Sequence, residues 1–178
     1  MTEPVFEHVP QEKESPIEGL TVRYTTKDDG KHLSEWLKDP SISSWFPMTG
    51  NEEIEDATVR WISFSQVKAS LTVEYEGVPC GIATLYLQGY KKLLHQAEFG
   101  VIVAPGYRNK GIGTFLIKSL MRLAKERFRI ELLHLQVYAE NPAIGLYKRL
   151  GFREFGRQTH WIKEDTRYVG RIFMERFL

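Results

Sequence analysis

A glycine-rich turn between residues 105 and 114 combines residue types that suit the binding of an anion. Arg108 and Lys110 stand just before Gly111 and Gly113, and an amphipathic helical pattern follows at once. The first N–H groups of a helix have no partner inside it, and glycine lets a ligand approach the backbone closely. The composition therefore favours a phosphate-bearing ligand held by backbone N–H groups at a helix N-terminus.

The turn departs from two familiar phosphate-binding motifs. The pattern G-x-x-x-x-G-K-[ST] fails because Gly111 is followed by Ile112. The dinucleotide pattern G-x-G-x-x-G fails because Gly113 is followed by Thr-Phe-Leu. On glycine spacing alone, an ordinary strand-to-helix turn with basic residues for solubility is an equally good interpretation.

Regular hydrophobic patterns predict the elements that must position this turn. Strands are expected at residues 20–24, 71–75, 80–88, 95–103, 133–137, 153–162 and 167–177. Helices are expected from Asp28 or Asp29 to Leu37, from Asn51 to about Ser70, from Ile112 through Ala124 and from Pro142 to Gly151, with residues 41–50 and 88–94 as loops. This order, β-α-α-β-β-β-α-β-α-β-β, is typical of one mixed α/β (α+β) domain with a single sheet.

Composition narrows the class of protein. The 178 residues are 42% hydrophobic, which is enough for one domain with a core. The net charge of +1 creates no global field for nucleic acid, and a nucleic-acid module built on the basic residues 106–129 is a minor alternative. No stretch approaches the ~18 apolar residues that cross a bilayer, so no membrane partner is expected.

Other features bear on compartment and metals. Residues 1–19 carry five glutamates and three prolines, which predicts a flexible acidic leader ahead of a domain at residues 20–178. This leader lacks the pattern of a signal peptide, so cytoplasmic residence is expected. The single cysteine, Cys80, is interpreted as a buried apolar thiol. No metal is expected, because the histidines show no ligand spacing: His8, His32, His95, His134 and His160.

Two motifs carry a family resemblance. The stretch V-A-P-G-Y-R-N-K-G-I-G (residues 103–113) resembles the acetyl-CoA signature of the GCN5-related N-acetyltransferase (GNAT) superfamily, and N-P-A-I-G-L-Y-K-R-L-G-F (residues 141–152) resembles its second signature. The resemblance covers about residues 20–178 and implies a single GNAT-like domain with a central, mostly antiparallel, twisted sheet flanked by helices. The chain is most similar to the spermidine and ribosomal-protein-alanine acetyltransferase branch, through Trp45-Phe46, residues 97–99 and residues 167–174.

The resemblance implies transfer of the acetyl group of acetyl-CoA, as co-substrate, directly to a primary amine. The acceptor would be a small molecule or peptide: a polyamine, a protein N-terminus, an amino acid or an amino sugar. A catalytically silent acyl-CoA-binding regulatory protein of the same fold is the alternative, and a homodimer is left open as the assembly.

The resemblance also assigns residues to the binding of acetyl-CoA. They are Val101, Ile102 and Val103 on a strand edge, Arg108, Asn109, Lys110, Gly111, Ile112, Gly113 and Thr114 at the turn, and Asn141 and Lys148 in the second motif. This second motif is one residue shorter than N-x-x-A-x-x-L-Y between Asn141 and Ala143, although Ala143 and Tyr147 keep their spacing.

Acetyl transfer to an amine requires a base and an acid. A primary amine has a pKa of ~10.4 and is almost wholly protonated at neutral pH, so a base must remove a proton before it can attack. By its place in the motif, Tyr147 is the expected acid for the departing thiolate, with a core tyrosine as the alternative. Glu98, which alternates opposite Phe99, is the expected base, with a surface ion pair as the alternative. His95 and His134 are weaker candidates.

Aromatic residues are expected to line the acceptor site. Trp45, Phe46 and Tyr138 are the principal candidates, with Trp161 and Tyr168 beside them. The acidic residues 52–56 would attract a polyamine, but acids in the first turn of a helix more often offset the helix dipole.

Overall fold

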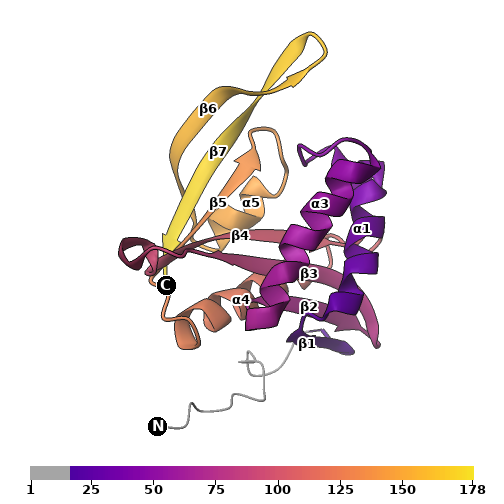
Figure 1. Cartoon of the computed structure of the whole chain (residues 1–178), viewed down its shortest axis with the longest axis vertical. Coiled ribbons are helices and arrows are strands. Elements are labelled where there is room, and N and C mark those ends of the chain that lie inside the picture. Colours follow the sequence, from indigo (N-terminus) through magenta and orange to yellow (C-terminus); the bar gives the residue numbers. More distant parts are fainter. Residues whose placement is uncertain (1–16) are drawn as a thin grey trace.

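Alternating apolar residues build a seven-stranded sheet in the order β1-β2-β3-β4-β5-β7-β6 (Figure 1). The strands are β1 (Leu20–Tyr24), β2 (Ser70–Tyr75), β3 (Val78–Leu87), β4 (Gln96–Val103), β5 (Leu132–Tyr138), β6 (Arg153–Glu164) and β7 (Arg167–Phe177). Only β4 and β5 pair in parallel within the part of the chain described here, residues 17–178 of this computed structural model. The predicted fold class, a mixed α/β domain with a mostly antiparallel sheet, is confirmed. Of the expected acidic leader, residues 1–16 lie outside the described residues.

Helices cover both faces of the sheet. They are α1 (Gly30–Lys38), α2 (Pro40–Ser43), α3 (Gly50–Ser63), α4 (Ile112–Glu126) and α5 (Ile144–Arg149), with short 3-10 turns at Lys27–Asp29, Phe64–Val67 and Lys91–Leu93. On one face, Trp61 and Ile62 of α3 pack with Ile82 and Ile102 of the sheet. On the other face, α4 and α5 pack against the larger of the two apolar clusters. None of the helices within residues 17–178 is both long and apolar enough to cross a membrane.

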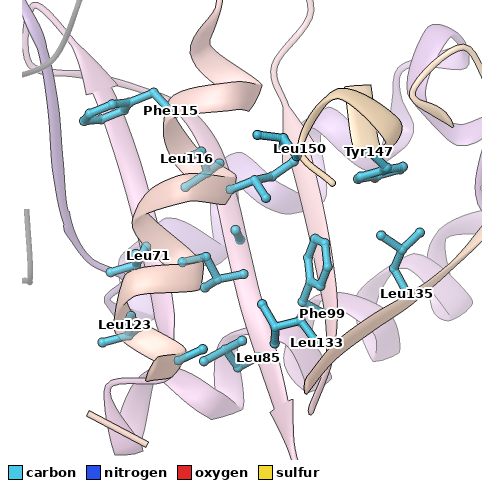
Figure 2. Close-up of a cluster of buried hydrophobic side chains, with 14 of the residues drawn as sticks. Leu71, Leu85, Phe99, Phe115, Leu116, Leu123, Leu133, Leu135, Tyr147 and Leu150 are labelled. Carbon is cyan, nitrogen blue, oxygen red and sulfur yellow. The ribbon is translucent and has the colours of Figure 1, made fainter. Parts of the chain in front are cut away.

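The apolar face of α4 follows from its helical spacing. Figure 2 shows Phe115, Leu116 and Leu123 of this helix against Leu71 and Leu85 of the sheet, and all five side chains are buried. Neighbouring residues of a strand point to opposite faces. Phe99 on β4 therefore belongs to the α4 face, whereas Glu98 and Gly100 point to the opposite face, where Gly100 lies against Trp61 of α3.

Two boundary predictions were wrong in detail. Residues 41–50 were expected to form a loop, but α2 lies at their start, because Pro40 suits a first helical position and the Asp39 carboxylate accepts a hydrogen bond from Ser41 N–H at 2.8 Å. The second long helix was expected to reach about Ser70. It ends at Ser63, and the chain leaves the following 3-10 turn through Lys68 in the left-handed region (φ 57°), so that Ser70 already begins β2.

Asp29 stands at the N-cap of α1 as expected, but its carboxylate serves another purpose. It accepts hydrogen bonds from the Arg23 guanidinium at 2.7 and 2.8 Å and from Thr26 N–H at 2.8 Å. Although burial alone would raise the pKa of Asp29, these donors lower it below its usual value. The interaction ties β1 to the start of α1 on the face that carries α3.

Candidate active site

The site begins where β4 and β5 separate. The two strands pair only from Gln96 to Glu98 on β4 and from Leu132 to His134 on β5. Beyond that point β4 stays paired with β3 as far as Val103, while β5 stays paired with β7 as far as Tyr138, and Figure 1 shows the two strands diverging. Residues 99–103 therefore present backbone groups along an edge that has no neighbouring strand in the described chain. Such an edge can pair with an extended ligand.

The glycine turn lies at the far end of this edge. Gly106, Asn109 and Gly111 have positive φ angles of 81°, 60° and 84°. Within residues 17–178, none of the turn and cap hydrogen bonds is donated by a backbone N–H of residues 108–114, and the first bond of α4 runs from Phe115 N–H to Gly111 C=O at 3.1 Å. Free amides next to left-handed residues form a concavity that binds anions, so the backbone predicted to hold phosphate is available.

Gly113 occupies the meeting point of three elements. A Cβ atom built on it would lie 3.4 Å from Leu146 Cδ2 of α5 and 3.7 Å from Val103 Cγ2 of β4. A larger side chain would fill the space between the start of α4 and the open strand edge. A Cβ atom alone would be in ordinary contact with these two side chains, so the position has room for alanine but not for a bulky residue without filling this route.

The polar side chains predicted to bind acetyl-CoA mostly contact the protein itself. Arg108 donates to Ser41 C=O at 3.0 Å, and Lys110 Nζ lies 5.5 Å from the centre of the Tyr107 ring. The Asn141 side-chain oxygen accepts from Ala143 N–H at 2.8 Å, so it closes the turn that leads into α5. Lys148 is exposed. The turn thus offers free backbone amides, and Arg108 and Lys110 keep further N–H donors besides these contacts.

The Tyr147 side chain extends from α5 on the α4 face of the sheet and points toward Phe99 and Leu135 (Figure 2). Its ring makes edge contacts with Phe99 and Phe152 at centroid distances of 6.2 and 6.1 Å, and the residue is only 8% exposed. Burial raises the pKa of Tyr147 to about 12. The raised pKa keeps the phenol protonated at neutral pH, and since its hydroxyl makes no hydrogen bond to any residue in the range 17–178, it is available to donate.

Glu98 lies on the opposite face, beside the point of separation. It lines a cavity of about 300 Å³ together with His134, Leu135, Gln136, Phe155 and Phe173. Among the described residues its carboxylate makes no ion pair with a lysine or arginine, and instead it accepts a hydrogen bond from the Gln136 amide at 2.7 Å. Burial lowers the pKa of His134, partly opposed by Glu98 and Glu175, so His134 is a neutral neighbour.

A polar network behind Glu98 was missed by the sequence reasoning. Arg171 of β7 donates to the Gln136 side-chain oxygen, which turns the Gln136 amide nitrogen toward Glu98. The guanidinium also contacts the rings of Trp161 and Phe173, 4.6 and 4.8 Å from their centres. Alternation along β5 places Gln136 on the same face of the sheet as His134 and Glu98. No local sequence pattern, however, indicates which residue of β7 lies next to Gln136.

The expected aromatic wall is present in part. Trp45 and Tyr138 meet edge to face at 6.3 Å and Tyr138 meets Trp161 at 5.2 Å, while Phe46 packs on Trp61 at 6.2 Å. Tyr138 is 4% exposed, so it supports this wall rather than offering a wide surface. Tyr168 does not join it: this residue is exposed and packs on His160 near the tip of the β6–β7 hairpin.

The surroundings of Cys80, Glu53 and the histidines bear on the roles expected for them. Cys80 is fully buried, and burial raises the pKa of its thiol to about 11, so the interpretation as an apolar thiol is confirmed. Glu53 accepts a hydrogen bond from Thr49 N–H at 2.6 Å and thereby caps α3, which supports the local role of these acids. Within residues 17–178 there is no group of three or more His, Cys, Asp or Glu side chains that could hold a metal. His8 lies outside the described residues.

Known proteins share both sequence and fold with this chain. Spermidine N(1)-acetyltransferase of Escherichia coli K12 is 30% identical over 87% of this chain and 84% of its own length. L-amino acid N-acetyltransferase AaaT of the same organism is 28% identical over 57% of this chain, a match that spans 63% of that enzyme. The crystal structure of ribosomal-protein-alanine N-acetyltransferase from Brucella melitensis superimposes with a TM-score of 0.75 and 26% identity, covering 89% of this chain and 99% of that one.

The family assignment rests on a further match. The sequence model of the acetyltransferase (GNAT) family matches residues 31–152, a range that contains both the glycine turn and Tyr147. It also holds the strands whose separation opens the site. The chain belongs to the acetyltransferase (GNAT) family.

Proposed function

We propose that this protein transfers the acetyl group of acetyl-CoA to a primary amine. The observation that carries the proposal is the open edge of β4, which runs from the free amides of the glycine turn to the point where Glu98 and Tyr147 stand on either side of the strand. One end of this path suits a diphosphate and the other end suits proton transfer. A long thioester with a phosphate-bearing end fits such a path.

The residues present fit acetyl-CoA. The backbone amides of residues 108–114 would hold its pyrophosphate, and the edge at Val101 to Val103 would pair with its extended pantetheine arm. When bound, acetyl-CoA supplies the acetyl group as a thioester. Arg108 and Lys110 add positive charge near the turn, although each also contacts the protein.

Protons move on the two faces of β4. Glu98 takes a proton from the ammonium form of the acceptor, which otherwise has no lone pair with which to attack. On the other face, Tyr147 gives its phenolic proton to the departing thiolate, a role that suits a phenol whose pKa of about 12 keeps it protonated. The acceptor then approaches from the α3 face, past Trp45 and Phe46, while the thioester approaches from the α4 face.

The relatives support an amine acceptor, since their names specify spermidine, L-amino acids and ribosomal-protein alanine. The test is release of free thiol from acetyl-CoA in the presence of a panel of polyamines, amino acids, amino sugars and N-terminal peptides. Titration calorimetry with acetyl-CoA accompanies it. Turnover with at least one amine is expected. Tight binding of acetyl-CoA without turnover of any amine would favour the silent acyl-CoA sensor, and no binding would refute both.

A further inference from the structure

We propose that Arg171 binds a carboxylate group of the acceptor, so that the preferred substrate is an amine that also carries a carboxylate, as an amino acid does. The inference rests on the proposed acetyl transfer and names the substrate class of the same site. Arg171 contacts two aromatic rings and two glutamine side chains, but no carboxylate among residues 17–178.

Arg171 is a half-buried cation that has no carboxylate partner among residues 17–178. Its guanidinium carbon lies 4.6 Å from the centre of the Trp161 ring and 4.8 Å from that of Phe173. No carboxylate lies within ion-pair distance of it in residues 17–178, whereas Arg23 and Arg167 each contact an acid at 3.1 Å or less. A charge removed from water is costly unless an opposite charge or several hydrogen bonds compensate it. An anionic ligand would supply that compensation.

Some N–H groups of the Arg171 guanidinium make no hydrogen bond to residues 17–178. Its Nε–H donates to the Gln158 side-chain oxygen at 2.9 Å, and one N–H of a terminal nitrogen donates to Gln136. Because arginine carries five N–H groups, three remain for a ligand. A carboxylate is the anion that best matches two of them side by side, since it accepts from an arginine in a bidentate manner.

Gln136 sets Arg171 and Glu98 at a defined separation. Arginine only donates, so the Gln136 oxygen must face Arg171, and the Gln136 nitrogen must then face Glu98. One amide side chain therefore spans the distance between a negative and a positive group. A zwitterion fits both: its ammonium approaches Glu98 and its carboxylate approaches Arg171. A polyamine would bring only positive charge and would be repelled by the guanidinium.

The neighbouring cavity suits the remainder of such a substrate. The rings of Phe155 and Phe173 give it apolar walls, and its volume of about 300 Å³ is at the small end of ligand sites. Phe173 and Gln136 contact Arg171 and also line this cavity, so the carboxylate position adjoins it. We therefore expect an amino acid with an apolar side chain.

The experiment compares amines that differ only in the carboxylate. Leucine, phenylalanine and methionine are each assayed against the corresponding amine without a carboxyl group, with spermidine included. For the wild-type protein, kcat/KM is expected to favour at least one amino acid by about 10- to 100-fold, the range that charged hydrogen bonds provide. Arg171→Gln should bring this ratio close to one. Because each ratio uses the same two compounds, differences in their amine pKa cancel between variant and wild type.

Two further variants separate binding from a structural role. Arg171→Lys keeps the positive charge but cannot bind a carboxylate through two parallel N–H groups, so its preference for the amino acid over the matching amine should be intermediate. The control is Arg167→Gln. Arg167 is an exposed arginine of the same strand that pairs with Glu164, and its replacement should leave the wild-type ratio unchanged. If the wild type acetylates the carboxylate-free amines as well as or better than the amino acids, the carboxylate site is refuted, whereas acetyl transfer is not. This outcome does not depend on whether Arg171→Gln folds. No turnover of any amine would overturn acetyl transfer and this inference with it.

Discussion

Glu98 and His134 form the last pair between β4 and β5, and beyond them the two strands separate. Phe99, the next residue along β4, carries the contact to Tyr147 on the opposite face. A single point of the sheet thus combines the end of strand pairing, a carboxylate on one face and a phenol on the other. This arrangement supports a reaction in which two substrates meet from opposite faces of one strand.

Gly113 provides a direct test of the acetyl-CoA path. In Gly113→Leu, the new side chain would lie between Leu146 and Val103 and would cover the amides at the start of α4. We expect the affinity for acetyl-CoA, measured by titration calorimetry, to fall by about 100-fold, because at least two charged hydrogen bonds are lost.

Gly89→Leu is the matched control for this substitution. A Cβ atom on Gly89 meets no atom within 4 Å, so this variant should bind acetyl-CoA like the wild type. If Gly113→Leu folds and keeps its affinity, the diphosphate does not bind at the turn.

The sequence predicted the elements that have strong local patterns. The spacing of Phe115, Leu116 and Leu123 identified α4, and the alternation around Phe99 placed Glu98 on the face away from the main core. The network of Gln136 and Arg171 was not predictable, because their contact depends on how β5 and β7 pair across 35 positions of sequence. The local role of Asn141 was likewise hidden, since the shortened motif does not show that its oxygen caps Ala143 N–H.

Tyr147→Phe tests the proton donor. The ring contacts with Phe99 and Phe152 stay, so acetyl-CoA affinity should change little while kcat falls by about 100-fold, the lower end of general acid catalysis. Since burial raises the pKa of Tyr147 to about 12, the wild-type rate should show no loss through Tyr147 ionisation up to about pH 10. The control is Tyr90→Phe, at a tyrosine that is 77% exposed. A fully active Tyr147→Phe protein would remove the phenol from the mechanism.

Glu98→Gln tests the base. The substitution keeps the size of the side chain and an oxygen that can accept from Gln136, but it removes the basic group. We expect kcat/KM to fall by about 100-fold at neutral pH and to recover as the pH approaches the pKa of the acceptor's own amine, where free amine is abundant. The readout is the pH profile of thiol release. A deficit that stays constant across this range would assign the proton to another group.

Gly100→Ala tests the packing that shapes the acceptor side. A Cβ atom at this position would lie 2.7 Å from Trp61 Cζ2 and 2.9 Å from the Tyr86 hydroxyl oxygen, so the two rings must move. Overpacking of this kind costs about 1–3 kcal/mol, which urea unfolding would register as a lower midpoint. Gly156→Ala is the control, since its nearest neighbour would be a Phe173 ring carbon at 3.5 Å. Equal midpoints for both variants would show that Trp61 can move without cost.

His134→Gln tests the burial of the residue opposite Glu98. Burial lowers the pKa of His134 in the folded state, whereas the unfolded chain binds a proton near pH ~6.5. The unfolded state therefore holds more protons below that pH, and the free energy of unfolding decreases as the pH falls from about 6.5 toward the folded-state pKa. Urea unfolding between about pH 5 and 7.5 should show a shallower dependence on pH in His134→Gln than in the wild type. Parallel curves for wild type and His134→Gln would mean that His134 titrates equally in both states and that the cavity beside Glu98 is open to water.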